Sequence, residues 1–168
     1  MKVSDENSIL SLVQKYEAND LPLEAIWLPC NCNHDKEPFT LDPAKFPNGI
    51  KVFNELHEKG IKIIPCVAPY IAKKSSGKYY NLLINEKLSI LEGMGKETYI
   101  GKTNDGESGF IDFFNPNTYA KLWQPGLKAL FAATNFDGLW LDFNEFTTLE
   151  TNEAYPTDSP FSPKNLNM

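Results

Sequence analysis

The stretch FDGLWLDFNEF, residues 136–146, carries an apolar run directly onto two carboxylates, Asp142 and Glu145. A short apolar run that follows turn-forming residues is typical of a buried strand. An acid at the end of such a strand either caps the next turn, pairs with a lysine or takes part in chemistry. These residues alone leave the alternatives open.

Two further apolar runs precede this one in the chain, LEAIWL (23–28) and IKIIPCVAP (61–69). Helical patterns lie before, between and after them, so the order is helix, strand, helix, strand, helix, strand. This alternation predicts an α/β fold with parallel strands and right-handed crossovers. In such folds ligands gather at the carboxyl ends of the strands, where PCN, APY and DFNE stand here.

The helices are predicted from apolar spacing and from their end signals. The first begins with Ser4 as the cap, and the third begins at Asn115 and Pro116. Pro125 and Gly126 should kink the third helix. The inward-facing residues of the first two helices are Ile9, Leu12, Val13 and Tyr16, then Ile50, Phe53 and Leu56, with Gly60 ending the second helix.

Residues 70–109 form the least regular part of the sequence. A short helix is predicted near Asn85–Leu91, and GKTNDGESG (101–109) is rich in turn residues. The segment is too long for a simple connection, and insertions of this kind are usually functional or mobile.

Composition narrows the function classes. The chain of 168 residues has a formal charge of -6, and its sixteen basic residues are all Lys. An acidic chain without a basic cluster argues against nucleic-acid binding. The lack of Arg removes the usual bidentate clamp for anions, so a neutral substrate fits better. No apolar run reaches membrane-spanning length, and the N-terminus does not resemble a signal peptide, so a soluble chain with no membrane partner is expected.

Three cysteines are too few for a disulfide scaffold. Cys30, Cys32 and His34, with Cys66, could imitate a zinc set, but the spacing is not that of structural zinc sites. Two small, half-buried thiols and no metal are therefore predicted. His57, on the second helix, is predicted to flank the core rather than to act as a catalytic base.

FDGLWLDFNEF resembles the nucleophile signature of glycoside hydrolase family 31, the α-glucosidase and α-xylosidase family, written D-G-[ILM]-W-x-D-M-N-E-P. The stretches LPLEAIWL, FTLDPAKFPNGIKVFNELHEKGIKIIPCVAPYI and YIGKTNDGESGFIDFFNPNTYAKLW are similar to further blocks of that family, in the same order. Together these blocks extend from about residue 9 to residue 146.

The resemblance implies a retaining α-glucosidase on a (β/α)8 TIM barrel that acts on an α-glucoside or oligosaccharide and uses no cofactor. Asp142 stands at the position of the nucleophile, which forms a glycosyl-enzyme intermediate. Asn31 could bind a sugar hydroxyl, and Glu145 would support the site. Asp112, in IDFFNP, matches an acidic position of the family and could line the pocket or cap the third helix, of which the structural role is favoured. Trp27 and Trp140 could stack on sugar rings, but their places within strands favour core packing.

Several positions depart from the family pattern. Pro29, Cys30 and Asn31 stand where the family has D-I-D, and Ala68 replaces the Asp of V-D-P. A neutral amide stabilises developing positive charge less than a carboxylate does. The alternative is therefore a non-catalytic relative that binds carbohydrate weakly or not at all.

A complete barrel of this kind takes about 250 residues, and only three of its eight strands can be recognised here. We therefore predict a partial catalytic barrel over residues 1–146, followed by a poorly ordered polar tail at 147–168. The general acid/base of the family lies outside the matched blocks, so the isolated chain is expected to be inactive. Open barrel edges also predict self-association.

Overall fold

The computed structural model of the protein describes residues 3–73, 77–92 and 95–144. The chain divides into two compact units. Unit 1 comprises the residues up to Val67 together with Leu127–Asp142, and unit 2 comprises Ala68–Gly126 and the residues from Phe143 onward. The predicted polar tail lies outside the described residues.

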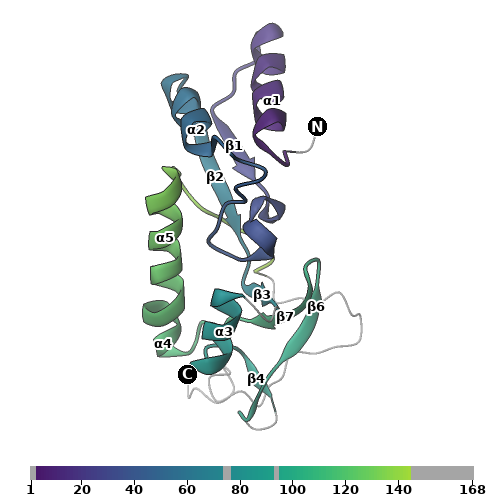
Figure 1. Ribbon diagram of the computed structural model, residues 1–168, viewed down its shortest axis with the longest axis vertical. Helices are drawn as coiled ribbons and strands as arrows, with labels where there is room; N and C mark the ends of the chain where they lie inside the picture. Colours follow the sequence, from purple (N-terminus) through teal and green to yellow (C-terminus); the bar gives the residue numbers. More distant parts are fainter. Residues whose placement is uncertain (1–2, 74–76, 93–94, 145–168) are drawn as a thin grey trace. The chain divides into compact units, whose positions relative to one another are not determined.

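Unit 1 is built on a three-stranded parallel sheet, which confirms the three predicted strands. The strands are β1 (Ala25–Leu28), β2 (Lys62–Val67) and β8 (Trp140–Leu141), in the order β1-β2-β8. In Figure 1 the β1 and β2 arrows run side by side. The sheet is open among the described residues, with β1 and β8 as its outer strands, so it is a segment of a barrel rather than a closed one.

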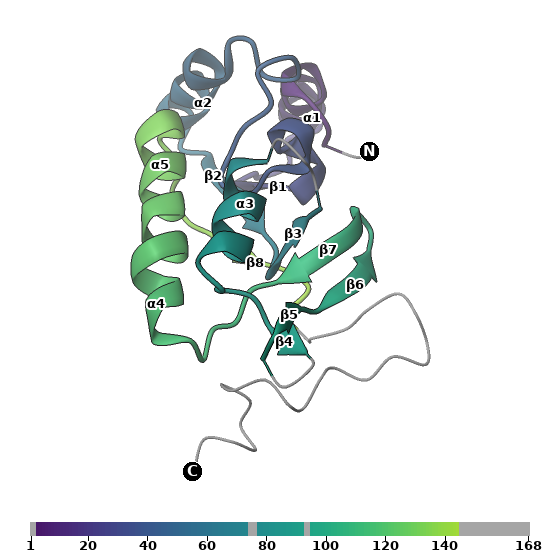
Figure 2. The ribbon, with the colours of Figure 1, turned by 60° about the horizontal axis from the view of Figure 1, so that its bottom comes forward.

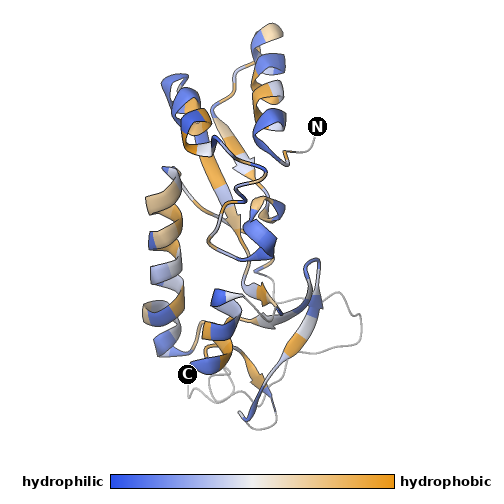
Figure 3. Ribbon diagram, in the orientation of Figure 1, coloured by the Kyte–Doolittle hydropathy of each residue, from blue (hydrophilic) through white to orange (hydrophobic). Residues whose placement is uncertain are grey.

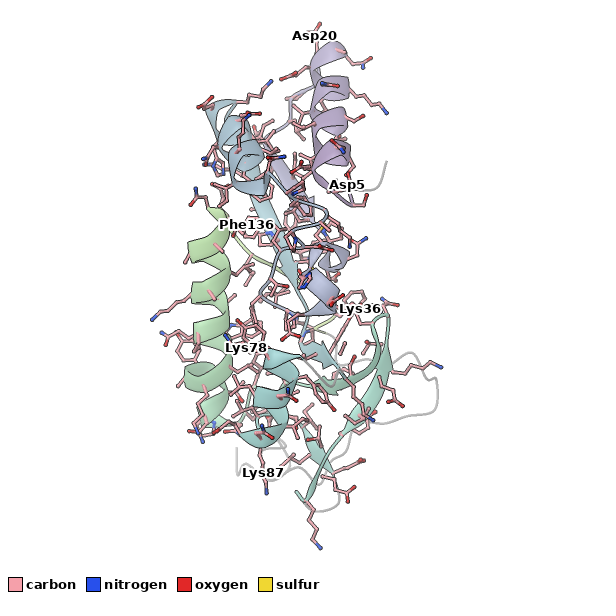
Figure 4. The ribbon with its side chains drawn as sticks, in the orientation of Figure 1. Asp5, Asp20, Lys36, Lys78, Lys87 and Phe136 are labelled. Carbon is pink, nitrogen blue, oxygen red and sulfur yellow. A yellow bond between two sulfur atoms is a disulfide. The ribbon has the colours of Figure 1, made fainter. Side chains whose placement is uncertain are left out.

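Helix α1 (Glu6–Ala18) begins one residue later than predicted. Asp5, rather than Ser4, is the N-cap, because its carboxylate accepts the backbone N–H of Ser8 at 2.8 Å. The Ser8 hydroxyl in turn contacts the backbone N–H of Asp5, which completes a capping box. Figure 4 labels Asp5 and Asp20 at the two ends of this helix.

Helix α2 (Gly49–Glu58) turns Phe53 and Leu56 into the core, as predicted. Ile50 was predicted to face inward, but 53% of its surface is exposed, because Val52 and Gly49 occupy the inward positions of the first turn. Gly60 has a φ of +79°, in the left-handed region that glycine adopts without strain. A residue in this conformation commonly follows the last turn of a helix.

Helix α2 is tied to α1 by a side chain. The Glu6 carboxylate accepts two hydrogen bonds from Asn48, one from the backbone N–H at 2.9 Å and one from the side-chain amide at 3.1 Å. Asn48 precedes α2, so the first residue of one helix satisfies a donor at the start of the next.

The core of unit 1 lies between these helices and one face of the sheet. Figure 3 shows the apolar colouring of β1 and β2 and the alternation along α1. The side chains with the least exposure are Ile9, Val13, Ile26, Leu28, Phe53, Leu56, Ile63 and Val67. Burying a side chain of this size contributes about 1.5–3 kcal/mol, so the helices dock mainly through these residues.

Unit 2 holds the irregular segment, and its main element is an antiparallel sheet that the sequence did not predict. The order is β3-β7-β6 (Figure 2), with β3 at Tyr70–Ala72, β6 at Ile100–Thr103 and β7 at Gly106–Phe110. The turn residues of GKTNDGESG form the β6–β7 hairpin, and Gly106 takes a φ of +100° there. Two shorter strands, β4 (Leu91–Glu92) and β5 (Glu97–Thr98), precede the hairpin in the chain and pair with each other.

The predicted helix at 85–91 is wrong. The helix of this segment is α3 (Lys78–Asn85), and Leu83 is its fully buried residue. Tyr79 and Leu83 are four positions apart and share one face, a periodicity that the other apolar residues of this helix, Tyr80, Leu82 and Ile84, obscure.

The third predicted helix begins where expected. Asn115 caps α4 (Pro116–Thr118), a π-helical turn follows at Tyr119–Trp123, and α5 (Gln124–Thr134) continues the chain. The irregularity thus lies just before Pro125 rather than at it. Proline has no N–H, so position 125 makes no regular helical bond. The N–H of the preceding residue, Gln124, donates five positions back, to the carbonyl of Tyr119, which is the wider spacing of a π-helical turn.

Candidate functional site

Asp142 lies directly after β8, at the carboxyl end of the sheet in unit 1. Its backbone N–H donates to the carbonyl of Val67, the last residue of β2, at 3.2 Å. Val67 and Leu141 are the last residues of β2 and β8 that pair in register, and this bond extends the pairing by one residue. The main chain at Asp142 is therefore held against the end of the central strand, and its side chain is half-buried.

Phe143, the next residue, adopts the left-handed conformation with a φ of +57°. A bulky non-glycine residue in this region is strained, and such strain collects at functional sites. The chain thus turns sharply immediately after the acid. Glu145, which the sequence predicts to support the site, lies outside the described residues.

Asn31 follows β1 at the same edge of the sheet. It belongs to the 3₁₀ turn η1 (Cys30–Cys32), and its side chain is exposed. Its backbone carbonyl accepts a hydrogen bond from the Lys45 ammonium group. A second 3₁₀ turn, η2 (His34–Lys36), follows. Asn31 and Asp142 thus lie at the ends of the two outer strands, with β2 between them.

Cys30 and Cys66 form a disulfide, so the prediction of two thiols is wrong. The reason lies in the strand register. Leu28 pairs with Pro65, so the residues just after β1 run beside Cys66, and the two Cα atoms are 5.0 Å apart. The bond joins two cysteines that lie 36 positions apart in the chain, which no local spacing could indicate. Cys32 is a free, buried cysteine.

One aromatic pair lies on the sheet face opposite the helices. Trp27 pairs in register with Ile64, and the Trp27 and Trp140 rings meet edge to face with centroids 5.8 Å apart. Core packing was predicted for both residues, but 54% of Trp27 is exposed. Trp27 alternates with the buried Ile26 and Leu28, so it points to the face that the helices leave uncovered.

The amino end of the same sheet carries a second aspartate with a different environment. Asp137 accepts the backbone N–H of Ile63 at 2.8 Å and contacts His57 Nε2 at 2.7 Å, and Lys62 Nζ lies 3.2 Å away. Burial alone would raise the pKa of Asp137, but the hydrogen bonds from Ile63, His57 and Lys62 outweigh it and lower that pKa. His57 therefore flanks the sheet as predicted, and it is paired with an acid.

Gly138, the glycine of the DG pair, faces the side chain of Ile64 in β2. A Cβ atom at Gly138 would lie 2.9 Å from Ile64 Cδ1, the end of a side chain that would have to shift. Asp137 thus has a structural role at this end of the sheet, which the sequence did not indicate.

Asp112 lies in unit 2 and is buried. Its Oδ1 accepts the backbone N–H of Phe114 at 2.9 Å, and its backbone carbonyl accepts the Thr118 hydroxyl at 2.7 Å. Burial raises the pKa of Asp112. These bonds shape the turn before α4, as expected of a structural residue.

Among the described residues, no group of three or more metal-ligating side chains is present, and no helix is long and apolar enough to cross a membrane. A pocket of about 320 Å³ in unit 1 is lined by residues 39–41, 43 and 46–51 and by Leu130, Ala133 and Thr134 of α5. Neither Asn31 nor Asp142 lines it.

The comparisons with known proteins agree with the strand topology. The model of the family described as "Glycosyl hydrolases family 31 TIM-barrel domain" matches residues 1–166. The chain is 30% identical over 147 residues to human neutral alpha-glucosidase AB, and 28% identical over 142 residues to glucosidase 2 subunit alpha of Schizosaccharomyces pombe. These alignments cover 84% and 83% of this chain, and the chain spans about 15% of the length of either relative.

The solved structure of a glucosidase II alpha subunit in its alpha3-Glc2-bound form shares the fold. The TM-score is 0.82 at 22% identity, with 98% of this chain and 19% of that chain covered. The order of the parallel strands and the family match over nearly the whole chain point to the same origin. This chain belongs to glycosyl hydrolase family 31 and represents a part of its TIM-barrel domain.

Proposed function

We propose that the chain supplies the nucleophile of a retaining α-glucosidase site, and that Asp142 is that nucleophile. The observation that carries the proposal is the place of Asp142 at the carboxyl end of a parallel strand, where its main chain bonds the end of β2. In barrel enzymes this edge of the sheet holds the reacting groups. Family membership and the relatives named alpha-glucosidase support the same substrate class.

In the proposed reaction the Asp142 carboxylate attacks the anomeric carbon of an α-glucoside. The bond to the leaving oxygen breaks, a glycosyl ester forms, and water later hydrolyses that ester. A retaining site needs a second carboxyl group about 5–5.5 Å from the first to protonate the leaving group. Asp142 cannot also supply this proton, so turnover requires a second carboxyl group from another residue.

Asn31 is proposed to bind a sugar hydroxyl, either by accepting a hydrogen bond from it or by donating one to it. Its side chain is exposed at the same edge of the sheet as Asp142. As a neutral amide it orients the sugar without adding negative charge. Glu145 is proposed to support the site from the segment after the nucleophile.

The proposal is tested with 5-fluoro-α-D-glucosyl fluoride. Fluoride leaves without protonation, so this reagent examines the nucleophile without requiring the acid/base. We expect one glycosyl adduct per chain by intact mass, and none in Asp142→Asn. An adduct of equal yield in Asp142→Asn would contradict the assignment.

A non-catalytic carbohydrate-binding relative is the second candidate. It is favoured by the strand ends of β1 and β2, where Cys30 is held in a disulfide and Ala68 is buried. These positions carry no carboxylate. Retained glucose binding with no adduct in the wild-type chain would support this candidate.

A further inference from the structure

The Cys30–Cys66 disulfide lies at the edge of the sheet that holds the proposed nucleophile. Cys66 belongs to β2 and pairs in register with Trp140 of β8, two residues before Asp142. Val67, next to Cys66, accepts the backbone N–H of Asp142. The disulfide therefore connects the turn after β1 to the same stretch of β2 that fixes Asp142.

The other hydrogen bonds of the turn lie within it or lead to the loop that follows it, where the Lys45 ammonium group donates to the carbonyl of Asn31. Within the turn, Cys32 donates to the carbonyl of Pro29 at 2.9 Å, and Asn33 donates to the carbonyl of Cys30 at 3.1 Å. The backbone N–H of Asp42 bonds the carbonyl of Cys32 at 2.9 Å. None of these hydrogen bonds joins the turn to β2. The disulfide, in contrast, attaches the turn covalently to that strand.

The third cysteine does not compete for this bond. Cys32 is 2% exposed, and burial raises its pKa to about 11, so it remains a thiol at neutral pH. A thiol is a poor nucleophile compared with its thiolate. Cys30 is half-buried whereas Cys66 is 3% exposed, so an external thiolate reaches the sulfur of Cys30 more easily.

We propose that the Cys30–Cys66 disulfide is a positioning element of the sugar site, which holds Asn31 beside the end of β2, and that its reduction weakens sugar binding. The inference rests on the proposed function, because it assigns a role in that same site. In the reducing step, a dithiol attacks Cys30 Sγ and releases the Cys66 thiolate. The second thiol of the reagent then frees Cys30, so two protein thiols and one oxidised reagent result.

The bond itself is tested by counting thiols. Maleimide alkylation under denaturing conditions should give one adduct before treatment with dithiothreitol, on Cys32, and three adducts after it. Three adducts without reduction, in protein purified with free thiols blocked at lysis, would overturn the proposal.

Positioning is tested by hydrogen exchange. Reduction should speed amide exchange at residues 30–33 while α1 and α2 keep their protection. The double variant Cys30→Ser, Cys66→Ser should reproduce this pattern without reductant, and Cys32→Ala, which keeps the disulfide, should not. Unchanged exchange at residues 30–33 after reduction would refute the positioning role.

The effect on the site is read from inactivation by 5-fluoro-α-D-glucosyl fluoride. We expect reduction to raise KI by about threefold to tenfold, the factor that one lost hydrogen bond gives, with a smaller change in kinact. Partial unfolding would instead lower the yield of adduct at constant KI.

The two proposals fail in different ways. Equal KI in both redox states refutes the role of the disulfide and leaves the nucleophile assignment intact. Absence of an adduct in both states counts against the proposed function, whereas hydrogen exchange still decides the positioning role.

Discussion

Two aspartates stand at opposite ends of the same strand, and their surroundings differ. Asp137, at the amino end of the sheet, accepts the N–H of Ile63 and meets His57 and Lys62. Asp142, at the carboxyl end, is fixed through its backbone N–H and is followed by the strained Phe143. The amino end of a parallel barrel sheet is usually devoted to stability and the carboxyl end to chemistry. A structural acid and a proposed catalytic one therefore lie only five positions apart in one segment.

The largest expected effect belongs to the carboxyl end. Asp142→Asn should lower the rate of adduct formation with 5-fluoro-α-D-glucosyl fluoride by at least about 100-fold, because an amide is a far weaker nucleophile than a carboxylate. Its free energy of unfolding should stay within about 0.5 kcal/mol of the wild type. A large loss of stability in urea denaturation would show that Asp142 is structural as well.

At the amino end, Asp137→Ala should destabilise the fold by about 1–3 kcal/mol, since the Ile63 N–H loses its side-chain acceptor. Urea denaturation measures this change. Glu55→Ala, which removes an exposed carboxylate from α2, serves as the matched control and should cost less than about 0.5 kcal/mol. Equal losses in the two variants would remove the distinction between the ends of the sheet.

The pH dependence of stability follows from the lowered pKa of Asp137. A carboxyl group whose pKa is lower in the folded state stabilises the fold above its unfolded pKa, and this contribution is lost as pH falls through the folded pKa. The loss should therefore lie below a pH of about 4. Asp137→Asn should flatten that part of the profile of unfolding free energy. Parallel profiles for the two proteins would contradict the assignment.

The smallest expected effect concerns Asn31. Asn31→Ala should raise KI for the fluoroglucoside by about threefold to tenfold, the value of one hydrogen bond, without changing the melting temperature. Asn33→Ala, a change in the same loop, is the control. Identical KI values for Asn31→Ala and the wild type would exclude Asn31 from the sugar site.

Much of unit 1 could be predicted from the sequence because its signals are local. Apolar runs with helical or strand spacing marked β1, β2 and the buried face of α1. In unit 2, Asn115 with Pro116 marked a helix start in the same local way. Helix ends were less certain, since Ser4 and Asp5 are both good caps and only the contact with Ser8 decides between them.

The features that were missed depend on residues far apart in the chain. The Cys30–Cys66 disulfide follows from the β1–β2 register, and the β3-β7-β6 sheet pairs Tyr70 with Phe110. Neither pairing leaves a short-range pattern. The exposure of Trp27 depends on which face of the sheet the helices cover, so strand propensity could not reveal it.

The place of Asp142 was predicted from its motif, and its location at the carboxyl edge of the sheet agrees with that prediction. Its role as the nucleophile stays a proposal. The same motif contains Asp137, whose bonds to β2 and α2 are apparent only in the folded chain.

The most direct measurement is to locate the trapped sugar along the chain. After reaction with 5-fluoro-α-D-glucosyl fluoride, trypsin releases the peptide from Ala129 to Lys164, which contains Asp137, Asp142 and Glu145. Tandem mass spectrometry separates these three positions. We predict that the glycosyl group is on Asp142. A glycosyl group on Glu145 or Asp137, with Asp142 unmodified, would contradict the central assignment.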